Sequence, residues 1–232
     1  MINSVRNAVL SVANKNNFGY ITPDDFNLYA KQAQLDIFEN YFYQYNNWIV
    51  KQNARLSGSG YSDVVRNIEI VIDSFSSTTP LVYSILNTTF DLPSDYYYVN
   101  NIIYNNAKEV DRVSHDKLIN LLASNLTAPS IMFPAYSMEA NDITVYPSTI
   151  TTNIAAQYIR LPKDPKWTYT TIVGGTPLFD QTDPLYQDFE LPESDEPLLV
   201  AKILQYSGMS IREVELYNFG TAEETANKQI EG

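Results

Sequence analysis

The chain has no cysteine and a single histidine among its 232 residues. The absence of cysteine excludes disulfide bonds, thiolate metal sites and cysteine nucleophiles. One imidazole, that of His115, is too little for a zinc site built on histidine and cysteine. We therefore expect no metal centre of this kind and no cofactor, and a reducing compartment suits the composition.

Positive charge is also scarce. There are 15 Lys and Arg against 27 Asp and Glu, which gives a formal net charge of −12, and charged residues make up only 18% of the chain. Tyrosine is abundant instead, with 18 residues against 8 glycines. An acidic surface repels phosphate backbones, and no cluster of Lys and Arg offers a local exception. Groove binding to nucleic acid is therefore not expected.

Long apolar runs are missing as well. The first residues, Met1–Arg6, lack the apolar stretch and cleavage site of a signal peptide. No segment approaches the roughly 20 apolar residues that cross a bilayer. We expect a soluble chain of the cell interior without membrane contact.

The clearest local signal that is present starts a helix. Thr22 is a good N-cap, Pro23 suits the first helical position, and Asp24 and Asp25 lie at the positive end of the helix dipole. From about residue 23 the pattern stays helical to about Leu56, without internal Gly or Pro. Such a helix is on the order of 50 Å long.

This helix carries more aromatic surface than one core face can hide. At about 100° per residue, Tyr41, Phe42 and Tyr43 spread over about 200° of its circumference. A second apolar face favours contact with a neighbouring subunit. The alternative is a helix buried in its own fold, with the tyrosine hydroxyls reaching water. The residues expected at a subunit interface are Phe38, Tyr41, Phe42, Tyr43, Tyr45 and Trp48.

The rest of the chain reads as a β-rich middle and a helical end. Residues 2–12 and 62–75 have helical spacing, although a strand also fits the second segment. From residue 76 to about 185, short β-prone pieces alternate with turn residues, and one helical turn is expected over 116–124. The expected strands are Leu81–Leu86, Tyr96–Tyr104, Ile143–Tyr146, Ala155–Leu161 and Thr168–Val173.

The C-terminal part predicts two helices. Ser194 or Asp195 caps the first, which Gly208 should end, and the capping box Ser210–Glu213 should start the second. The predicted fold is therefore α+β: a helical bundle of N- and C-terminal helices that carries a central β-rich module. The expected parts are residues 1–75 with the long helix about 23–56, the β-rich module 76–192, and the returning helices with a polar tail, 193–232.

Candidate catalytic residues are few and have simpler explanations. In Ser114–Asp116 a Ser, His and Asp are adjacent, but catalytic triads come from separate segments, and no Gly-x-Ser-x-Gly is present. His115 is better explained as a turn residue.

The acidic clusters Asp24/Asp25, Asp36/Glu39 and Glu193/Asp195/Glu196 could pair as in a glycosidase, but those at helix starts stabilise helices. Lys163–Trp167 brings cations near an indole, although its prolines favour a surface turn. We expect no catalytic residue.

Several short motifs follow one another along the chain: Tyr20–Asn27, Ala33–Phe38, Phe90–Tyr98, Lys108–Val110, Val113–His115, Phe133–Tyr136, Ile143–Pro147, Gln157–Pro162 and Pro165–Trp167. Their order resembles that in structural proteins of the neck ring and tail adaptor of crAss-like and other short-tailed bacteriophages.

The resemblance implies a virion structural protein that forms a homo-oligomeric ring, commonly twelve-fold. Its partners would be the portal protein and the adjacent neck or tail protein, with viral DNA passing through the ring. It would occupy the virion neck, and the host cytoplasm before assembly, without enzymatic activity. Twelve copies at −12 each would carry −144 formal charges, which would repel passing phosphates rather than hold them.

Two other functions stay open from the sequence. Exposed tyrosines with Trp48 or Trp167 could stack on sugars in a phage tail or surface module that binds host glycan. A carboxylate-based hydrolase is the second alternative.

Overall fold

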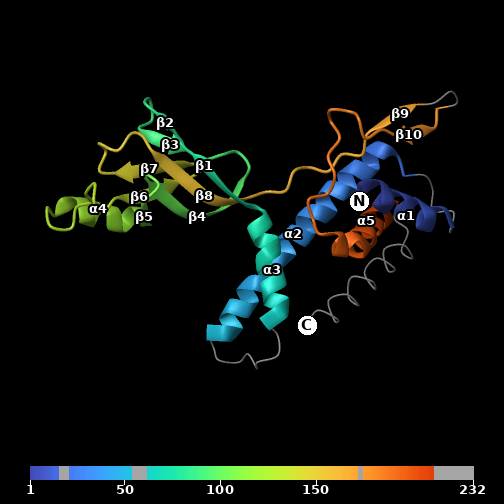
Figure 1. Cartoon of the computed structure of the whole chain (residues 1–232), viewed down its shortest axis with the longest axis horizontal. Helices are drawn as coiled ribbons and strands as arrows, with labels where there is room; N and C mark the ends of the chain where they lie inside the picture. Colours follow the sequence, from blue (N-terminus) through green and yellow to red (C-terminus); the bar gives the residue numbers. More distant parts are fainter. Residues whose placement is uncertain (16–20, 54–61, 172–174, 212–232) are drawn as a thin grey trace. The chain divides into compact units, whose positions relative to one another are not determined.

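The computed structural model describes residues 1–15, 21–53, 62–171 and 175–211, and it has the α+β composition expected from the sequence (Figure 1). The chain divides into two compact units. Met1–Ile72 and the chain from Pro162 form one unit, called here the helical unit. Asp73–Leu161 form the other, called the barrel unit.

The long helix of the helical unit begins where the sequence predicts. Helix α2 spans Pro23–Asn53, and the backbone N–H of Asp25 donates to Thr22 Oγ1 at 3.2 Å. The Thr22 hydroxyl donates in turn to the Asp25 carboxylate, at 2.6 Å, so the cap is reciprocal. The predicted end near Leu56 lies outside the described residues.

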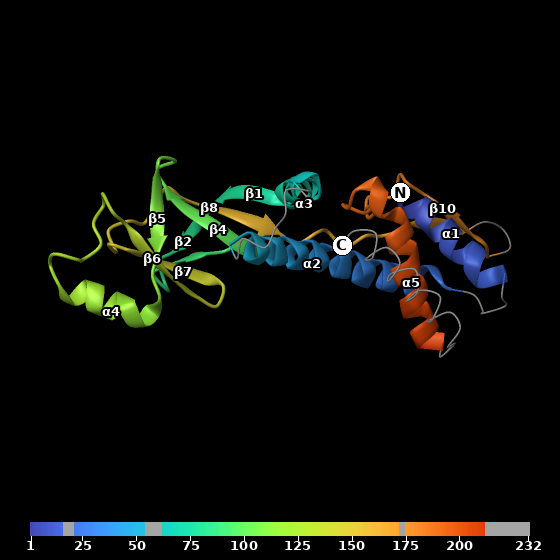
Figure 2. The same ribbon diagram turned by 90° about the horizontal axis from the view of Figure 1, so that it is seen from below.

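Two other helices pack in this unit. Helix α1 spans Ile2–Lys15, and helix α5 spans Glu196–Ile211 after the short 3-10 turn η1, Glu193–Asp195. Helix α5 contacts both α1 and α2, and α1 lies against α5 in both views (Figures 1 and 2). The core that they share is almost entirely aliphatic and aromatic, and includes Ile2, Val5, Val9, Phe26, Ala30, Ile37, Phe38, Leu199, Ile203 and Leu204.

The predicted stop at Gly208 is wrong, because α5 continues through it to Ile211. Glycine lowers the stability of a helix by about 1 kcal/mol relative to alanine, an effect that burial can offset. Gly208 and its neighbour Ser207 are both buried. Ser210, expected to cap a second helix, lies in the last turn of α5, and the rest of that predicted helix falls outside the described residues.

Helix α3, Ser62–Ser74, confirms the helical alternative for this segment and leads into the barrel unit. An eight-stranded sheet follows in the order β1-β8-β4-β5-β6-β7-β3-β2. Its strands are β1 (Ser76–Pro80), β2 (Val82–Ser84), β3 (Thr89–Asp91), β4 (Tyr96–Tyr104), β5 (Lys108–Arg112), β6 (Ala135–Glu139), β7 (Asp142–Tyr146) and β8 (Ile154–Arg160).

The sheet curls into a nearly closed barrel. Strands β1 and β2 occupy its two edges, yet Leu81 alone joins them in the chain. The backbone N–H of Leu81 donates to Ile154 O on β8 at 2.8 Å. Leu81 therefore brings the two edge strands of the nearly closed sheet close together.

Inward side chains alternate along the strands and fill the barrel. On β7 Ile143 and Val145 are buried, and on β8 Ile154, Ala156 and Tyr158 are buried, as period-2 alternation requires. All neighbouring strands are antiparallel except β5 and β6, which pair in parallel. Helix α4, His115–Ala123, makes the crossover between them and confirms the predicted helical turn.

The sequence predicts five of the strands and misses five. Strands β1, β3, β5 and β6 were not expected, nor was β10. Strand β5, Lys108–Arg112, shows the reason: Val110 is its only apolar residue and its only buried one. A strand with one inward residue leaves almost no hydrophobic pattern.

The predicted module boundary at residue 192 also differs from the observed one. Residues from Pro162 onward belong to the helical unit, including the hairpin of β9 (Tyr169–Thr171) and β10 (Pro177–Phe179). The hairpin looks like part of a β-rich module in sequence. Buried Trp167, Phe189 and Leu191 instead anchor this segment in the helical unit.

Candidate functional site

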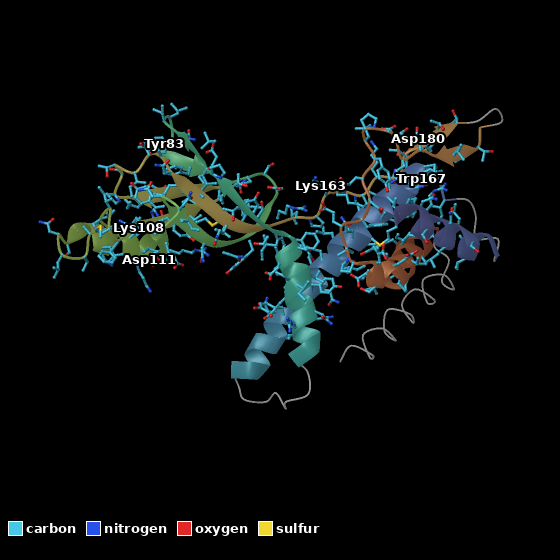
Figure 3. All side chains as sticks on the ribbon, in the orientation of Figure 1. Tyr83, Lys108, Asp111, Lys163, Trp167 and Asp180 are labelled. Carbon is cyan, nitrogen blue, oxygen red and sulfur yellow. The ribbon has the colours of Figure 1, made fainter. Side chains whose placement is uncertain are left out.

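The histidine and serine that were weighed as catalytic residues lie at the start of α4. His115 is the exposed first residue of α4, and Ser114 precedes the helix. Figure 3 shows how side chains are distributed over the described residues. Within those residues no three His, Asp or Glu side chains come together in a way that could hold a metal ion.

The acidic clusters mainly join helices. The Tyr41 hydroxyl on α2 donates to the carboxylate of buried Asp195 at 2.6 Å. Asp36, also on α2, accepts from Lys202 Nζ of α5 at 3.5 Å and from the Tyr206 hydroxyl. Asp25 belongs to the cap of α2. Paired carboxylates directed at a common substrate position are not found among these groups, each of which has its own hydrogen-bond partner.

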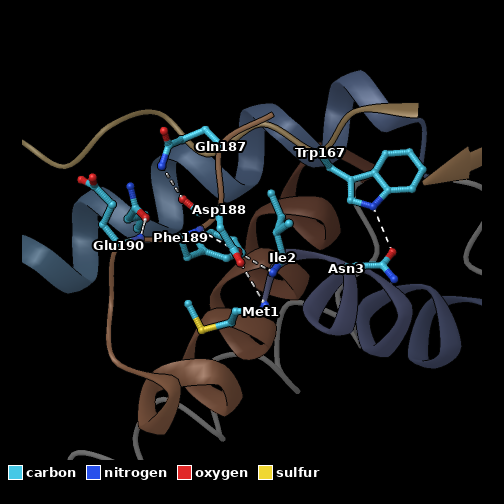
Figure 4. A network of polar contacts seen from close by, with 9 residues as sticks. Met1, Ile2, Asn3, Trp167, Gln187, Asp188, Phe189 and Glu190 are labelled. Carbon is cyan, nitrogen blue, oxygen red and sulfur yellow. Dashed lines mark hydrogen bonds and ion pairs between the residues drawn. The ribbon is translucent and has the colours of Figure 1, made fainter. Parts of the chain in front are cut away.

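Trp167 is enclosed rather than presented to a ligand. Its side chain is 2% exposed, and its indole Nε1–H donates to Asn3 Oδ1 at 3.1 Å (Figure 4). The Arg6 guanidinium lies 3.8 Å above the ring centroid, a cation–π contact, and Tyr169 and Phe179 stack beside it. Lys163, Asp164 and Lys166 of the expected surface turn are exposed, whereas Trp167 is buried, so the sequence-based alternative that Trp167 stacks on sugars or bases is wrong.

Side chains of α2 hold the segment around Trp167 in place. Asn27 accepts from the Trp167 N–H at 2.8 Å and donates to the Trp167 carbonyl at 3.2 Å. Gln34 lies about two turns further along the same face of α2. Its side chain donates to Lys163 O at 2.7 Å and accepts from Glu190 N at 3.0 Å. Each amide uses both its donor and its acceptor, and each satisfies one backbone N–H and one backbone carbonyl of this irregular segment.

Asp188 fixes the start of α1 (Figure 4). Its carboxylate accepts from the Met1 amino group at 3.1 Å and from the backbone N–H of Ile2 at 2.7 Å. Partial burial works to raise the pKa of Asp188. The hydrogen bonds from Ile2, Met1 and Phe189 outweigh it and hold that pKa below the usual value for aspartate.

The aromatic residues expected at a subunit interface fall into three groups. Phe38 is 1% exposed, so the prediction that it lies on an outer surface is wrong: it packs in the core of the helical unit. Tyr41, Phe42 and Tyr45 are half-buried, and the Phe42 ring meets Phe38 edge-on at 5.0 Å between centroids. Tyr43 is 67% exposed. The side chain of Trp48 lies outside the described residues.

The main exposed apolar surface of the barrel unit lies on α4 and the loop that follows it. We call residues 115–133 the α4 arm. From Leu118 to Met138 the chain has no charged residue, although Asp, Glu, Lys and Arg make up 18% of the whole. The large side chains exposed on the arm are Ile119, Leu122, Leu126, Ile131, Met132 and Phe133.

A second apolar feature is the turn between β2 and β3. Ile85 is 85% and Leu86 is 93% exposed. The turn is closed by a 2.8 Å hydrogen bond from Thr88 N to Ser84 O, so its geometry is defined. The central positions of turns usually carry Gly, Asn, Asp or Ser. Two solvent-exposed aliphatic side chains are therefore unusual in this turn. We call Ile85 and Leu86 the β2–β3 tip.

An open cleft of about 900 Å³ lies beside the α4 arm. Val113, Leu121 and Met138 supply apolar wall, whereas Arg112 and Lys117 add positive charge. Its lining contains no carboxylate among the described residues. Polar side chains complete the lining: Ser114, His115, Asn120 and Thr127. A cleft with an apolar wall, polar side chains and two cations is suited to an aliphatic group that is followed by negative charge.

Sequence reasoning did not find the α4 arm or the β2–β3 tip. The signal was present as two uncharged stretches, Ser74–Phe90 and Leu118–Met138, in an otherwise acidic chain. Apolar residues in these stretches could equally have been buried, because periodicity alone does not distinguish an inner from an outer face in short segments.

Comparison with known proteins gives no assignment. The chain matches no family model and no curated protein. Within the described residues, none of the helices has the length and apolar character needed to span a membrane.

Proposed function

We propose that this chain is a non-catalytic virion structural protein that forms a homo-oligomeric ring in the neck of a tailed bacteriophage. In this proposal the helical unit acts as a bundle that carries the barrel unit. The ring contacts the portal protein on one side and the adjacent neck or tail protein on the other, and viral DNA passes through it. Before assembly the chain resides in the host cytoplasm.

One observation carries the proposal: large apolar surface on a chain that has no described catalytic arrangement. The α4 arm, the β2–β3 tip and Tyr43 of α2 all expose large apolar or aromatic side chains. Monomeric soluble proteins rarely expose contiguous apolar patches beyond a few hundred Å², and larger ones mark sites of protein contact. The order of the motifs, which resembles that in neck-ring and tail-adaptor proteins, also supports a role in the phage neck.

Charge supports the second part of the proposal. The net charge of −12 makes the chain a poor binder of DNA phosphates. A conduit for DNA needs this property, because attraction to its wall would retard the passing duplex.

The test is assembly with the portal protein. We expect the purified chain to form a closed ring, alone or on the portal, by light scattering and electron microscopy. A chain that stays monomeric with and without the portal would contradict the proposal. Tyr43→Asp should weaken assembly if the exposed face of α2 contributes. Tyr43→Phe is the matched control, since it keeps the aromatic ring on this face and adds no charge.

A further inference from the structure

We propose that the β2–β3 tip of one copy inserts into the cleft beside the α4 arm of the next copy, so that the ring closes through a head-to-tail contact. This inference rests on the proposed function, because it names the surfaces through which identical chains would join. Both surfaces belong to the barrel unit, and each is described completely within it.

The first argument is shape. Ile85 and Leu86 project from a closed turn with almost their whole side chains exposed. The cleft offers about 900 Å³ beside apolar groups of Val113, Leu121 and Met138. The cleft is open to solvent and is also lined by polar side chains such as Asn120 and Thr127, and its space is large enough for two aliphatic side chains.

The second argument is charge. Asp91 of β3 and Asp142 of β7 are directly opposite each other near the base of the β2–β3 hairpin. Two like charges at paired positions destabilise a sheet, so the barrel itself gains nothing from them. Arg112 and Lys117 line the cleft. When the tip enters the cleft of another copy, Asp91 and Asp142 approach Arg112 and Lys117. The opposite charges attract, and they also favour one relative orientation of the two copies.

The third argument is exposure. Ile85, Leu86 and the six large apolar side chains of the α4 arm all stay exposed in the folded barrel unit. Burying them against another copy is favourable, because it removes apolar surface from water. The tip and most of the arm also lie in the uncharged stretches Ser74–Phe90 and Leu118–Met138, so charge repulsion between acidic copies is weakest there.

The placement of the surfaces selects the symmetry. In Figure 1 the turn after β2 and helix α4 lie at separate places on the barrel unit. A contact between two different patches is heterologous, and repeated head-to-tail contacts give a closed ring or an open filament. An isologous dimer would need the same patch on both partners.

The test uses two full-length variants that each remove one half of the contact. Ile85→Ser with Leu86→Ser removes the tip, and Asn120→Trp fills the cleft from an exposed position that lines it. Each variant alone should associate at least about tenfold more weakly than the wild-type chain in sedimentation velocity. Mixed together, they should form a one-to-one dimer and nothing larger, because one intact tip and one intact cleft remain.

Matched controls separate the contact from general effects. Leu178→Ser with Leu185→Ser removes two exposed aliphatic side chains from the helical unit, and Asn120→Ala leaves the cleft empty. Both should associate like the wild type. Circular dichroism of every variant checks folding, which substitutions at exposed positions should leave intact.

Charge exchange gives a second readout. Arg112→Glu should weaken association, and adding Asp91→Arg and Asp142→Arg to the same chain should restore it at low salt, because every contact between copies then pairs the exchanged charges. The absence of native cysteine also allows Leu86→Cys and Asn120→Cys chains to be mixed for a disulfide between copies.

The outcomes are distinct. A wild-type chain that assembles while the tip and cleft variants assemble equally well would overturn this contact and leave the ring proposal standing. Larger oligomers from the mixture would also overturn it. A wild-type chain that stays monomeric with its portal would overturn the ring proposal, and the contact with it.

Discussion

The barrel unit and the helical unit are stabilised by different kinds of contact. In the barrel, backbone ladders pair almost every strand on both sides, and an apolar interior fills the space between them. In the helical unit, the described residues between Pro162 and Pro192 form one short hairpin and one isolated bridge, between Lys166 and Gln187. Side chains of α2 and residues at the chain start satisfy its backbone instead, through Asn27, Gln34 and the Asp188 carboxylate.

This difference teaches where single substitutions should act. A ladder distributes its hydrogen bonds over many residues, so one outward side chain matters little there. An irregular segment that depends on a few side chains concentrates stability in them. The barrel unit also has apolar side chains that do not pack in its interior. They are exposed on the α4 arm and on the β2–β3 tip.

The largest expected effect is at Trp167. Trp167→Ala should destabilise the helical unit by about 3–5 kcal/mol, because it leaves a cavity and removes the partners of Asn3 and Arg6. Hydrogen exchange should rise in α1, α2 and α5 while β4 and β8 keep their protection. Leu178→Ala, at an exposed position of β10, is the control. Equal loss of protection in both units would refute the separation.

The matching change in the barrel is Ile102→Ala. Ile102 is fully buried in the barrel interior, so its truncation should lower the stability of that unit by about 2–5 kcal/mol. Here exchange should rise in the strands and not in α1 or α5. Asn101→Ala, on the outer face of the same strand, should have little effect. Protection lost first in the helices would show that the barrel core does not depend on this residue.

A smaller effect is expected at the amide that binds the Trp167 backbone. Asn27→Ala should reduce stability by about 1–3 kcal/mol, because it leaves a partly buried N–H and carbonyl without their partners. Thermal unfolding measures the change, and Leu28→Ala at the adjacent exposed position serves for comparison. If the two variants melt alike, the side-chain anchors do not stabilise this segment as argued.

Acidification should weaken the helical unit through Asp188. Its folded-state pKa is below the unfolded value, so the carboxylate contributes stability at pH values above about 4 and loses it as pH falls through the folded pKa. Asp188→Asn should cost about 1–2 kcal/mol at pH 7 and flatten the dependence below pH 4. Urea unfolding at several pH values gives both quantities. An unchanged acid slope in Asp188→Asn would assign the dependence to other carboxylates.

The smallest effect on stability, with a larger one on association, is expected on the α4 arm. Leu126 is 94% exposed, so Leu126→Ser should change the free energy of unfolding by no more than about 0.5 kcal/mol. Self-association should nevertheless weaken in analytical ultracentrifugation. Destabilisation well beyond this limit would mean that the arm packs on its own chain rather than on another.

Local chemistry made several elements predictable. The cap at Thr22 and Pro23 fixed the start of α2, and the run without Gly or Pro let it continue. Strand β4 was predicted with its observed bounds, Tyr96–Tyr104, because it is long and rich in aromatic and β-branched residues. The candidate surface was predictable only in part: exposure of Tyr43 is observed, whereas Phe38 faces the core.

Sequence by itself determined the acidic balance, the absence of thiol chemistry, the α+β class and the start of the long helix, since each follows from composition or from neighbouring residues. Tertiary structure decided which unit takes residues 162–192, that Gly208 lies inside a helix, and which apolar residues stay outside. The reason is physical, because burial depends on partners that are distant in the chain, such as Asn27 for Trp167 and Ile154 for Leu81. The local sequence pattern does not indicate which distant residues these partners are.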